Sequence, residues 1–162
     1  MVNNVEMPPW LPDEICTISC KDENDFINIT YDRLIYDFFL QGVLFRGKRV
    51  LLPNEKSNDG KLKIYWHIGG DDNSLDHHNW DRRRTQRIPW IKAVIDNAIE
   101  PEVLVWKTVK NHDKRISLWL INLDYLIILS VKRDKYFLIT AYITCRSHTR
   151  EKLLKEYMGC KN

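Results

Sequence analysis

His67 stands in the segment KLKIYWHIGG, with apolar residues before it and two glycines shortly after it. The apolar and aromatic residues predict a strand over 62–68 that ends at a flexible glycine turn. A histidine at such a turn is well placed to face a cleft, and imidazole is the side chain that exchanges protons near neutral pH. The segment therefore offers a candidate acid or base. The alternative is a histidine that only hydrogen-bonds the backbone at a strand end.

Four arginines lie just ahead of a predicted helix start: Arg82, Arg83, Arg84 and Arg87. Guanidinium forks match two phosphate oxygens at once, and the N–H groups of a helix N-terminus also favour an anion. The net charge of the chain is only +3, so this clustering, more than the total, favours an anionic ligand. If Asp81 caps the helix, Arg83 and Arg87 share a face and Pro89 kinks the second turn. The alternative is a solvated turn that is partly paired with Asp81.

Thr140 and Tyr142 are two residues apart in KYFLITAYIT, which predicts a strand over 135–144. Because side chains alternate along a strand, Leu138 and Thr144 are expected on their face and Phe137, Ile139, Ala141 and Ile143 on the other. A hydroxyl can donate to a phosphate oxygen, and tyrosine can also stack on a base. Lys107 is a further candidate for phosphate contact. The alternative is that Thr140 and Tyr142 are ordinary strand residues.

Metal and nucleotide sites are poorly supported. The residues that a zinc site would need are Cys16, Cys20, His77 and His78, whose spacing does not match known zinc motifs. A divalent ion would have to bind the acidic residues Asp71, Asp72 and Asp76, and no second carboxylate cluster supports a two-metal nuclease. Phosphate-binding glycine loops, nucleophile elbows and dinucleotide fingerprints are missing from the sequence. We therefore expect neither a metal nor a cofactor.

The 162 residues are 44% apolar and 29% charged, values typical of a globular domain. That length suffices for one domain that buries about 68–70% of its unfolded surface. The sequence contains no run of about 18 apolar residues, so it predicts no membrane span. Residues 1–15 lack the basic start and apolar core of a secretory signal, and the four scattered cysteines indicate free thiols. We therefore expect a cytoplasmic protein with no membrane partner.

The predicted architecture is a single α+β domain over residues 1–162. Its expected parts are an N-terminal arm at 1–20, a helix at 21–42 and a core at 43–158. Apolar residues recur at helical spacing between Asp25 and Gln41, Asn24 or Asp25 can cap this helix, and Gly42 can end it. In the core, residues 43–52 are β-prone, and a second helix begins around Pro89 and ends before residue 101.

The rest of the core predicts a four-stranded antiparallel meander followed by a short C-terminal helix at 149–158. The expected strands are 103–109, 115–121, 125–132 and 135–144, which are rich in β-branched and aromatic residues and are separated by short polar turns. Helices packed on such a meander make the α+β class.

The order of these motifs resembles that of the barnase–EndoU–colicin–RelE-like nucleases (the BECR fold), particularly their phage-associated barnase-like branch. The resemblance covers roughly residues 43–158 and is carried by YWHIGG, RIPWIKAVIDNA, VLVWK, DYLIIL and FLITAY. It implies a helix with a four-stranded meander and metal-independent cleavage of RNA. Carried over by position, the site residues are His67, Arg82, Arg87, Thr140 and Tyr142. Three consecutive arginines depart from the family pattern and leave open which one contacts phosphate.

The predicted function is therefore that of an endoribonuclease of the toxin or phage–host conflict type, which cleaves RNA by attack of the ribose 2′-OH. His67 would transfer a proton, Arg82 and Arg87 would stabilise the transition state, and Tyr142 would be a second acid or base or position one. Arg83, Arg84 and Lys107 would bind substrate. The expected partners are RNA, including tRNA, and an acidic antitoxin or immunity protein.

Two alternatives from other classes stay open. One is a nucleic-acid-binding module with the same basic cleft and no chemistry, whose binding would depend on salt. The other is a protein-interaction module that uses the six tryptophans and seven tyrosines as a partner surface.

Overall fold

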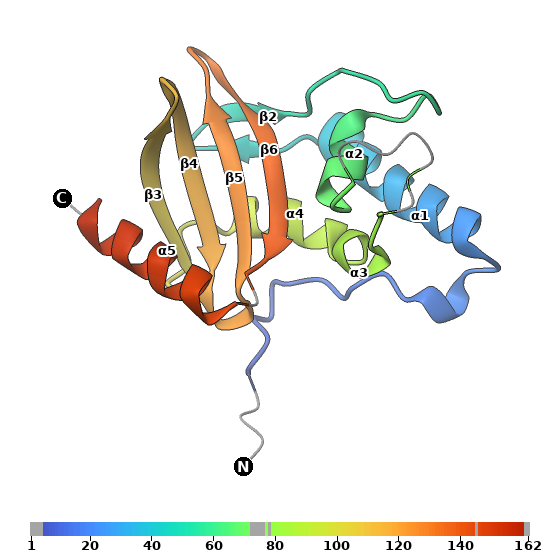
Figure 1. Cartoon of the computed structure of the whole chain (residues 1–162), viewed down its shortest axis with the longest axis horizontal. Coiled ribbons are helices and arrows are strands. Elements are labelled where there is room, and N and C mark those ends of the chain that lie inside the picture. The colour runs from blue at the N-terminus through green and yellow to red at the C-terminus, as the bar shows by residue number, and fades with distance from the viewer. Residues whose placement is uncertain (1–4, 72–76, 78, 145, 161–162) are drawn as a thin grey trace.

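A computed structural model describes residues 5–71, 77, 79–144 and 146–160. The helices are α1 (Glu23–Ile35), α2 (Lys63–Ile68), α3 (Arg82–Thr85), α4 (Ile88–Asp96) and α5 (Ser147–Gly159), with short helical turns η1 (Thr17–Ser19), η2 (Tyr36–Gln41) and η3 (Ile121–Leu123). The strands are β1 (Leu44–Phe45), β2 (Lys48–Leu51), β3 (Val103–Lys110), β4 (Asp113–Leu120), β5 (Tyr125–Val131) and β6 (Lys135–Ile143). The predicted α+β class is confirmed (Figure 1). None of the described helices has the length and apolarity to span a bilayer.

The six strands form one mixed sheet in the order β1-β2-β6-β5-β4-β3. Strands β3 to β6 are consecutive antiparallel neighbours, as the polar turns between them predicted. The prediction of a four-stranded, wholly antiparallel sheet is wrong, because β2 pairs with β6 in parallel and β1 adds a sixth strand. A ten-residue β-prone stretch was not enough to show which edge it would join.

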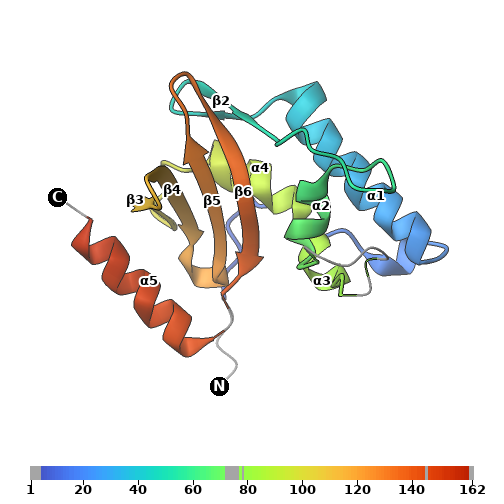
Figure 2. The ribbon, with the colours of Figure 1, turned by 45° about the horizontal axis from the view of Figure 1, so that its top comes forward.

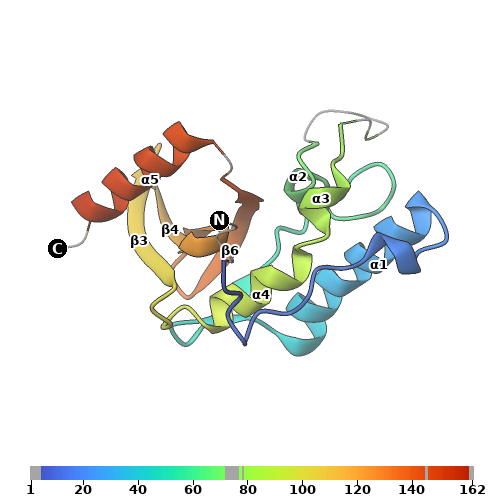
Figure 3. The ribbon, with the colours of Figure 1, turned by 90° about the horizontal axis from the view of Figure 1, so that it is seen from below.

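Helix α4 covers one face of the sheet, the N-terminal helix packs beside α4, and α5 covers part of the other face (Figure 3). On the first face Ile91 and Val94 of α4 are buried with Leu118 and Ile127 of the sheet. The apolar stripe predicted for this helix is thus confirmed, and it ends before residue 101 as expected. Figure 2 shows α5 beside β3 and β4, well away from α1 and α2.

The predicted N-terminal helix is also present, as α1 continued by the π-helical turn η2. Its cap is Asp22, whose carboxylate accepts a hydrogen bond from the Asp25 backbone N–H at 2.8 Å, so the predicted caps Asn24 and Asp25 are wrong. Gly42 follows the last turn with a φ of +82°, which favours glycine over other residues. The arm at 5–20 packs on the rest of the chain, since the Trp90 indole donates to the Pro12 carbonyl at 3.0 Å.

The segment predicted as a strand over 62–68 is instead the helix α2. The pattern of apolar residues fits both a helix and a strand, because Ile64 and Ile68 lie on the same face in either structure. Contacts outside the segment favour the helix: the Tyr65 hydroxyl lies 2.8 Å from Thr30 Oγ1 on α1, and the Trp66 indole donates to Asp59 at 3.1 Å. Tertiary contacts of this kind override weak local preference in a run of six residues.

Candidate functional site

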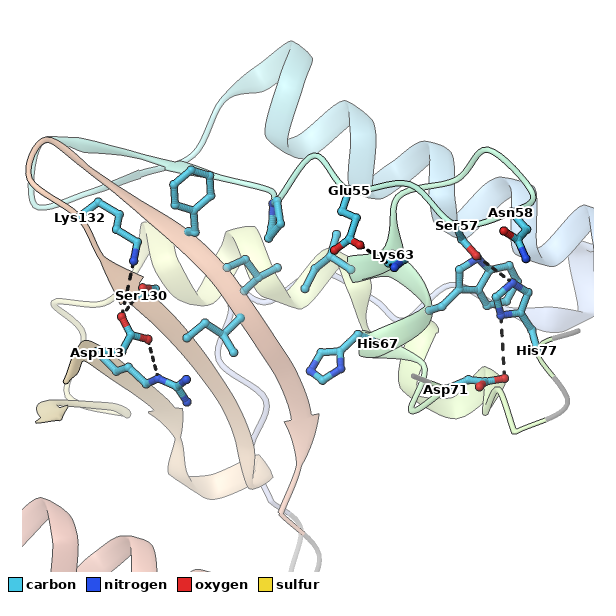
Figure 4. A pocket seen from close by; sticks show the side chains of 17 residues that line it. Glu55, Ser57, Asn58, Lys63, His67, Asp71, His77, Asp113, Ser130 and Lys132 are labelled. Atoms are coloured by element: carbon cyan, nitrogen blue, oxygen red, sulfur yellow. Dashed lines mark hydrogen bonds and ion pairs between the residues drawn. The ribbon is translucent and has the colours of Figure 1, made fainter. Parts of the chain in front are cut away.

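A cavity of about 790 Å³ lies between α2 and the sheet, and we call it the central pocket (Figure 4). One wall comes from the loop before α2 and from α2 itself: Pro53, Glu55, Ser57, Asn58, Lys63, Ile64, Trp66 and His67. The other wall comes from β4, β5, β6 and the turn after β5: Asp113, Arg115, Ser130, Lys132, Phe137, Leu138 and Ile139. Asp71 and His77 complete the lining.

His67 reaches the pocket because α2 buries its other faces. Ile64, Tyr65 and Ile68 are held in the core, which turns Lys63 and His67, four residues apart, to the same outer side. Figure 4 shows the imidazole of His67 pointing into the space between α2 and the sheet. His67 faces a cavity, as the sequence predicted. It does so from the helix that precedes the Gly69 turn, whereas the sequence predicted the end of a strand.

The sheet wall carries a charged network that the sequence reasoning missed. Asp113 accepts hydrogen bonds from Ser130 Oγ at 2.8 Å and from Arg115 Nε at 3.0 Å, and Lys132 Nζ lies 3.6 Å away. The hydrogen bond from Ser130, then that from Arg115, lower the pKa of the Asp113 carboxyl, and the charges of Lys132 and Arg115 add to the effect. Asp113 is therefore ionised at neutral pH and orients the Arg115 guanidinium.

A signal for this network was present in the sequence. Arg115 and Ser130 are polar residues inside strongly β-prone segments, and the hairpin register places them opposite each other. Polar side chains in a strand that is otherwise apolar mark the part of a sheet face that stays uncovered.

Thr140 and Tyr142 lie on the face of the sheet that carries this wall. Thr140 pairs with Ile128 and Tyr142 with Leu126, both of which face α5. The predicted alternation fails at Ile139, where a register shift leaves one extra residue in β6. Neither hydroxyl-bearing residue lines the central pocket itself.

The same register shift brings Phe137 to this face, because Phe137 pairs with Ser130. Leu138 turns instead into the main core, where it is fully buried. The sequence had assigned these two residues to the opposite faces. His67, Phe137 and Ser130 share the pocket, so the histidine lies on the side of the sheet that carries Thr140 and Tyr142.

Tyr142 is half-buried against the apolar cluster under α5, which includes Trp119 and Leu153. Burial raises the pKa of its hydroxyl, the nearby Arg84 charge opposes this shift, and Glu156 adds to it. The hydroxyl therefore keeps its proton at neutral pH and is a donor, not a base.

The arginine segment does not act as one cluster. The predicted cap is confirmed, since Asp81 Oδ1 accepts from the Arg83 N–H at 2.9 Å, but α3 stops at Thr85 and α4 starts afresh at Ile88. Partial burial by itself would raise the pKa of Asp81, but hydrogen bonds from Arg83 bring this pKa below its ordinary value. Proline near the start of α4 explains the break, because it cannot donate to a preceding turn.

The two predicted catalytic arginines lie outside the lining of the central pocket. Arg87 Nε lies 3.2 Å from Glu14 of the N-terminal arm, and its guanidinium sits 5.6 Å from the centre of the Trp90 ring. Arg82 lines a separate recess with Glu23 and Trp80. Their assignment beside His67 is therefore not supported by the geometry.

The remaining predicted cations have three different placements. The Arg83 guanidinium pairs with Asp81 at 3.2 Å. Arg84 packs against Gly70 in the turn after α2, so closely that a Cβ there would lie 3.2 Å from its Cζ. Lys107 pairs with Ile116, a residue of the main core, and so lies on the sheet face away from Thr140. Of the three, Arg84 is the one close to both the α2 turn and Tyr142.

His77 lines the central pocket on the side of α2. Its ring stacks on Trp66 with centroids 3.6 Å apart and planes 5° apart. Its Nε2 lies 3.8 Å from Asp59, and its Nδ1 lies 4.0 Å from Asp71. Among the described residues no group of three or more histidines, cysteines and carboxylates is arranged to hold a metal. The candidates Asp72, Asp76 and His78 lie outside the described residues.

Comparison of the chain with profiles of known protein families, with curated proteins and with solved structures finds no match. The functional argument therefore starts from the residues of the central pocket.

Proposed function

We propose that the protein is a metal-independent endoribonuclease and that the central pocket is its active site. The observation that carries this proposal is that His67 shares one open cavity with the cations Lys63, Arg115 and Lys132. An imidazole beside several cations suits the cleavage of a phosphodiester, which needs proton transfer and stabilisation of negative charge.

The reaction is a transesterification. A base removes the proton of the ribose 2′-OH, the oxygen attacks the adjacent phosphorus, and an acid protonates the departing 5′-oxygen. The products are a 2′,3′-cyclic phosphate and a free 5′-hydroxyl. His67 performs one of the two proton transfers. Glu55, which lines the same cavity and accepts from Lys63 Nζ at 2.6 Å, is a carboxylate available for the other.

Arg115 takes the role that the sequence had given to Arg82 and Arg87. Asp113 holds its Nε at 3.0 Å, which leaves the terminal nitrogens of the guanidinium for the non-bridging oxygens of a phosphate. A donor that is oriented before the substrate arrives contributes about 10²–10³ in rate. Lys63 and Lys132 add positive charge on the two walls of the cavity.

The sheet face beside the cavity positions the substrate. Thr140 and Tyr142 lie further along β6 on this face, and Arg84 lies close to Tyr142. Burial raises the pKa of Tyr142 and keeps its proton in place, so its hydroxyl donates a hydrogen bond to the RNA, and Arg84 contacts a phosphate next to the cleaved one.

The resemblance to the barnase–EndoU–colicin–RelE-like nucleases is part of this proposal. It is supported by four consecutive antiparallel strands with a helix on one face and an open polar region on the other. By the same resemblance the protein is of the toxin or phage–host conflict type, acts in the cytoplasm on RNA including tRNA, and is neutralised by an acidic partner that covers the cationic cavity.

Incubation of the purified protein with total RNA and with tRNA in EDTA tests the proposal. We expect fragments that end in 2′,3′-cyclic phosphate. The His67→Ala variant should release them at a rate about 10²–10⁴ lower than the parent. His148→Ala is the matched control, because His148 is an exposed histidine on α5 outside the pocket. Equal cleavage by the His67→Ala variant and the parent would show that the assignment is wrong.

A second candidate is an RNA-binding module without chemistry. The observation that favours it is that Glu55, the available partner for His67, has a side chain that is 71% exposed and paired with Lys63. This candidate predicts bound but intact RNA and no effect of His67→Ala on binding.

A further inference from the structure

Two turns at one end of the sheet carry a dense set of cations, of which the proposed chemistry uses Lys132 alone. One turn joins β1 to β2 and the other joins β5 to β6. The cations are Arg46, Lys48, Arg49, Lys132, Arg133 and Lys135, and we call this group the basic edge. Asp134 is the one acidic residue within 46–49 and 132–135.

The two turns are adjacent in space although they lie far apart in the chain (Figure 2). Arg49 and Lys135 are direct neighbours in the parallel ladder between β2 and β6, where strands are about 4.8 Å apart. Lys48 Nζ lies 3.4 Å from the Arg133 carbonyl oxygen, which it uses as an acceptor. The two turns therefore bring the six cations together into one surface region at this end of the sheet.

This surface is exposed and mostly not neutralised by the protein. All of its cations are exposed except Lys135, which is partly buried. Within the part of the chain that the structure describes, Lys132 is the member with an ion pair, to Asp113 at 3.6 Å. Cations held side by side create a positive potential that attracts a polyanion.

The basic edge is continuous with the central pocket. Lys132 belongs to both, and Lys135 Nζ lies 6.0 Å from the centre of the Phe137 ring, which lines the pocket. An RNA chain bound in the central pocket would therefore pass along these cations where it leaves the pocket beside β6. A flat anionic surface such as a bilayer would not use this connection to a concave cavity.

We infer that the basic edge binds the phosphates of the RNA chain that extends out of the central pocket. This inference rests on the proposed function, because it takes RNA as the ligand of the pocket. It predicts that long substrates bind more tightly than short ones and that the difference is electrostatic.

Charge reversal tests the inference directly. Arg46→Glu with Arg133→Glu changes the basic edge, and Lys152→Glu with Lys155→Glu makes the same charge change on exposed positions of α5. Binding of a 20-nucleotide RNA and of a dinucleotide is measured over a range of salt concentrations, with His67→Ala in every protein to prevent cleavage. The neutral pair Arg46→Gln with Arg133→Gln serves as a milder variant, and thermal unfolding verifies that each protein is folded.

The basic-edge variant is expected to bind the 20-nucleotide RNA at least tenfold more weakly, with the salt slope reduced by about 0.7 for each RNA phosphate that the protein no longer neutralises. Its dinucleotide binding and the α5 variant are expected to stay at the parent level. Unchanged affinity and salt slope for the long RNA would overturn the inference, and so would an equal loss in the α5 variant or binding to anionic vesicles in place of RNA.

The two proposals fail separately. If the parent protein cleaves RNA and the basic-edge variant cleaves long RNA with an unchanged KM, the nuclease stands and the basic edge is overturned. If the parent binds RNA through the basic edge and releases no fragments, the nuclease fails and the inference stands.

Discussion

The face of the sheet that packs on α5 is apolar at one end and polar at the other. Under α5 the strands present large apolar side chains, among them Trp106, Trp119, Leu126 and Ile128. Toward the other end they present Asp113, Arg115, Ser130 and Lys132, which line the central pocket. Both groups come from β3–β5 and the turn after β5, so the side chains of the same strands change from apolar under α5 to polar beside the central pocket.

The covered end is built for stability. Trp106 and Trp119 meet edge to face at 6.3 Å, and the Trp106 indole donates to Glu156 of α5 at 3.1 Å. The open end instead holds a carboxylate with three polar partners, an arrangement that contributes little to stability at an exposed site. The first end therefore anchors the fold, and under the proposed function the second end binds the RNA.

Removal of the largest fully buried side chain of the covered end is expected to have the largest effect. Trp119 is fully buried, and Trp119→Ala should lower the free energy of unfolding by about 3–5 kcal/mol. Urea unfolding measures this loss. Arg115→Ala is the comparison at the open end, where we expect a change below about 1 kcal/mol. Similar losses in both variants would erase the distinction between the two ends.

Activity should show the reverse pattern. Arg115→Ala is expected to lower kcat for RNA cleavage by about 10²–10³, because it removes a charge that stabilises the transition state. Lys114→Ala, which removes the exposed neighbouring cation outside the pocket lining, is the control and should leave kcat unchanged. A change confined to KM would mean that Arg115 binds RNA without contributing to the chemistry.

A smaller effect is expected from pH. The folded-state pKa of Asp113 lies below its ordinary value of 3.8, so the ionised carboxylate stabilises the fold above that pH. This contribution is lost as the pH falls through the folded value, below 3.8. Asp113→Asn should therefore be slightly less stable than the parent at pH 6, with a smaller difference at pH 2. Thermal unfolding at both pH values measures the difference, and a constant difference would contradict the assigned pKa direction.

The sequence predicted the elements with long, regular patterns. Strands β3–β6 and helix α4 were recovered because repeated β-branched residues and a clear apolar stripe leave few alternatives. Helix α2 was misread because six residues, four of them apolar, fit a strand and a helix equally well. The extra residue at Ile139 could not be foreseen, because a bulge depends on the partner strand and leaves no local pattern.

The candidate site was predicted in part. His67 was identified from its residue type and its glycine-rich turn, and it does line the pocket. Arg82 and Arg87 were chosen because arginines cluster in the chain, but each has a local environment that only the fold reveals, such as Glu14 beside Arg87. Arg115 was missed because the sequence does not show that its strand faces the same cavity as His67, which lies far away in the chain.

The most direct test of the account is the single-turnover cleavage rate of a short RNA by the parent, His67→Ala, Arg115→Ala and the double variant. If the two residues act on one phosphodiester, each single change lowers the rate by at least about 10², and the double change costs less than the product of the two. A rate for His67→Ala equal to that of the parent would contradict the account, because the imidazole in the pocket would then take no part in the reaction.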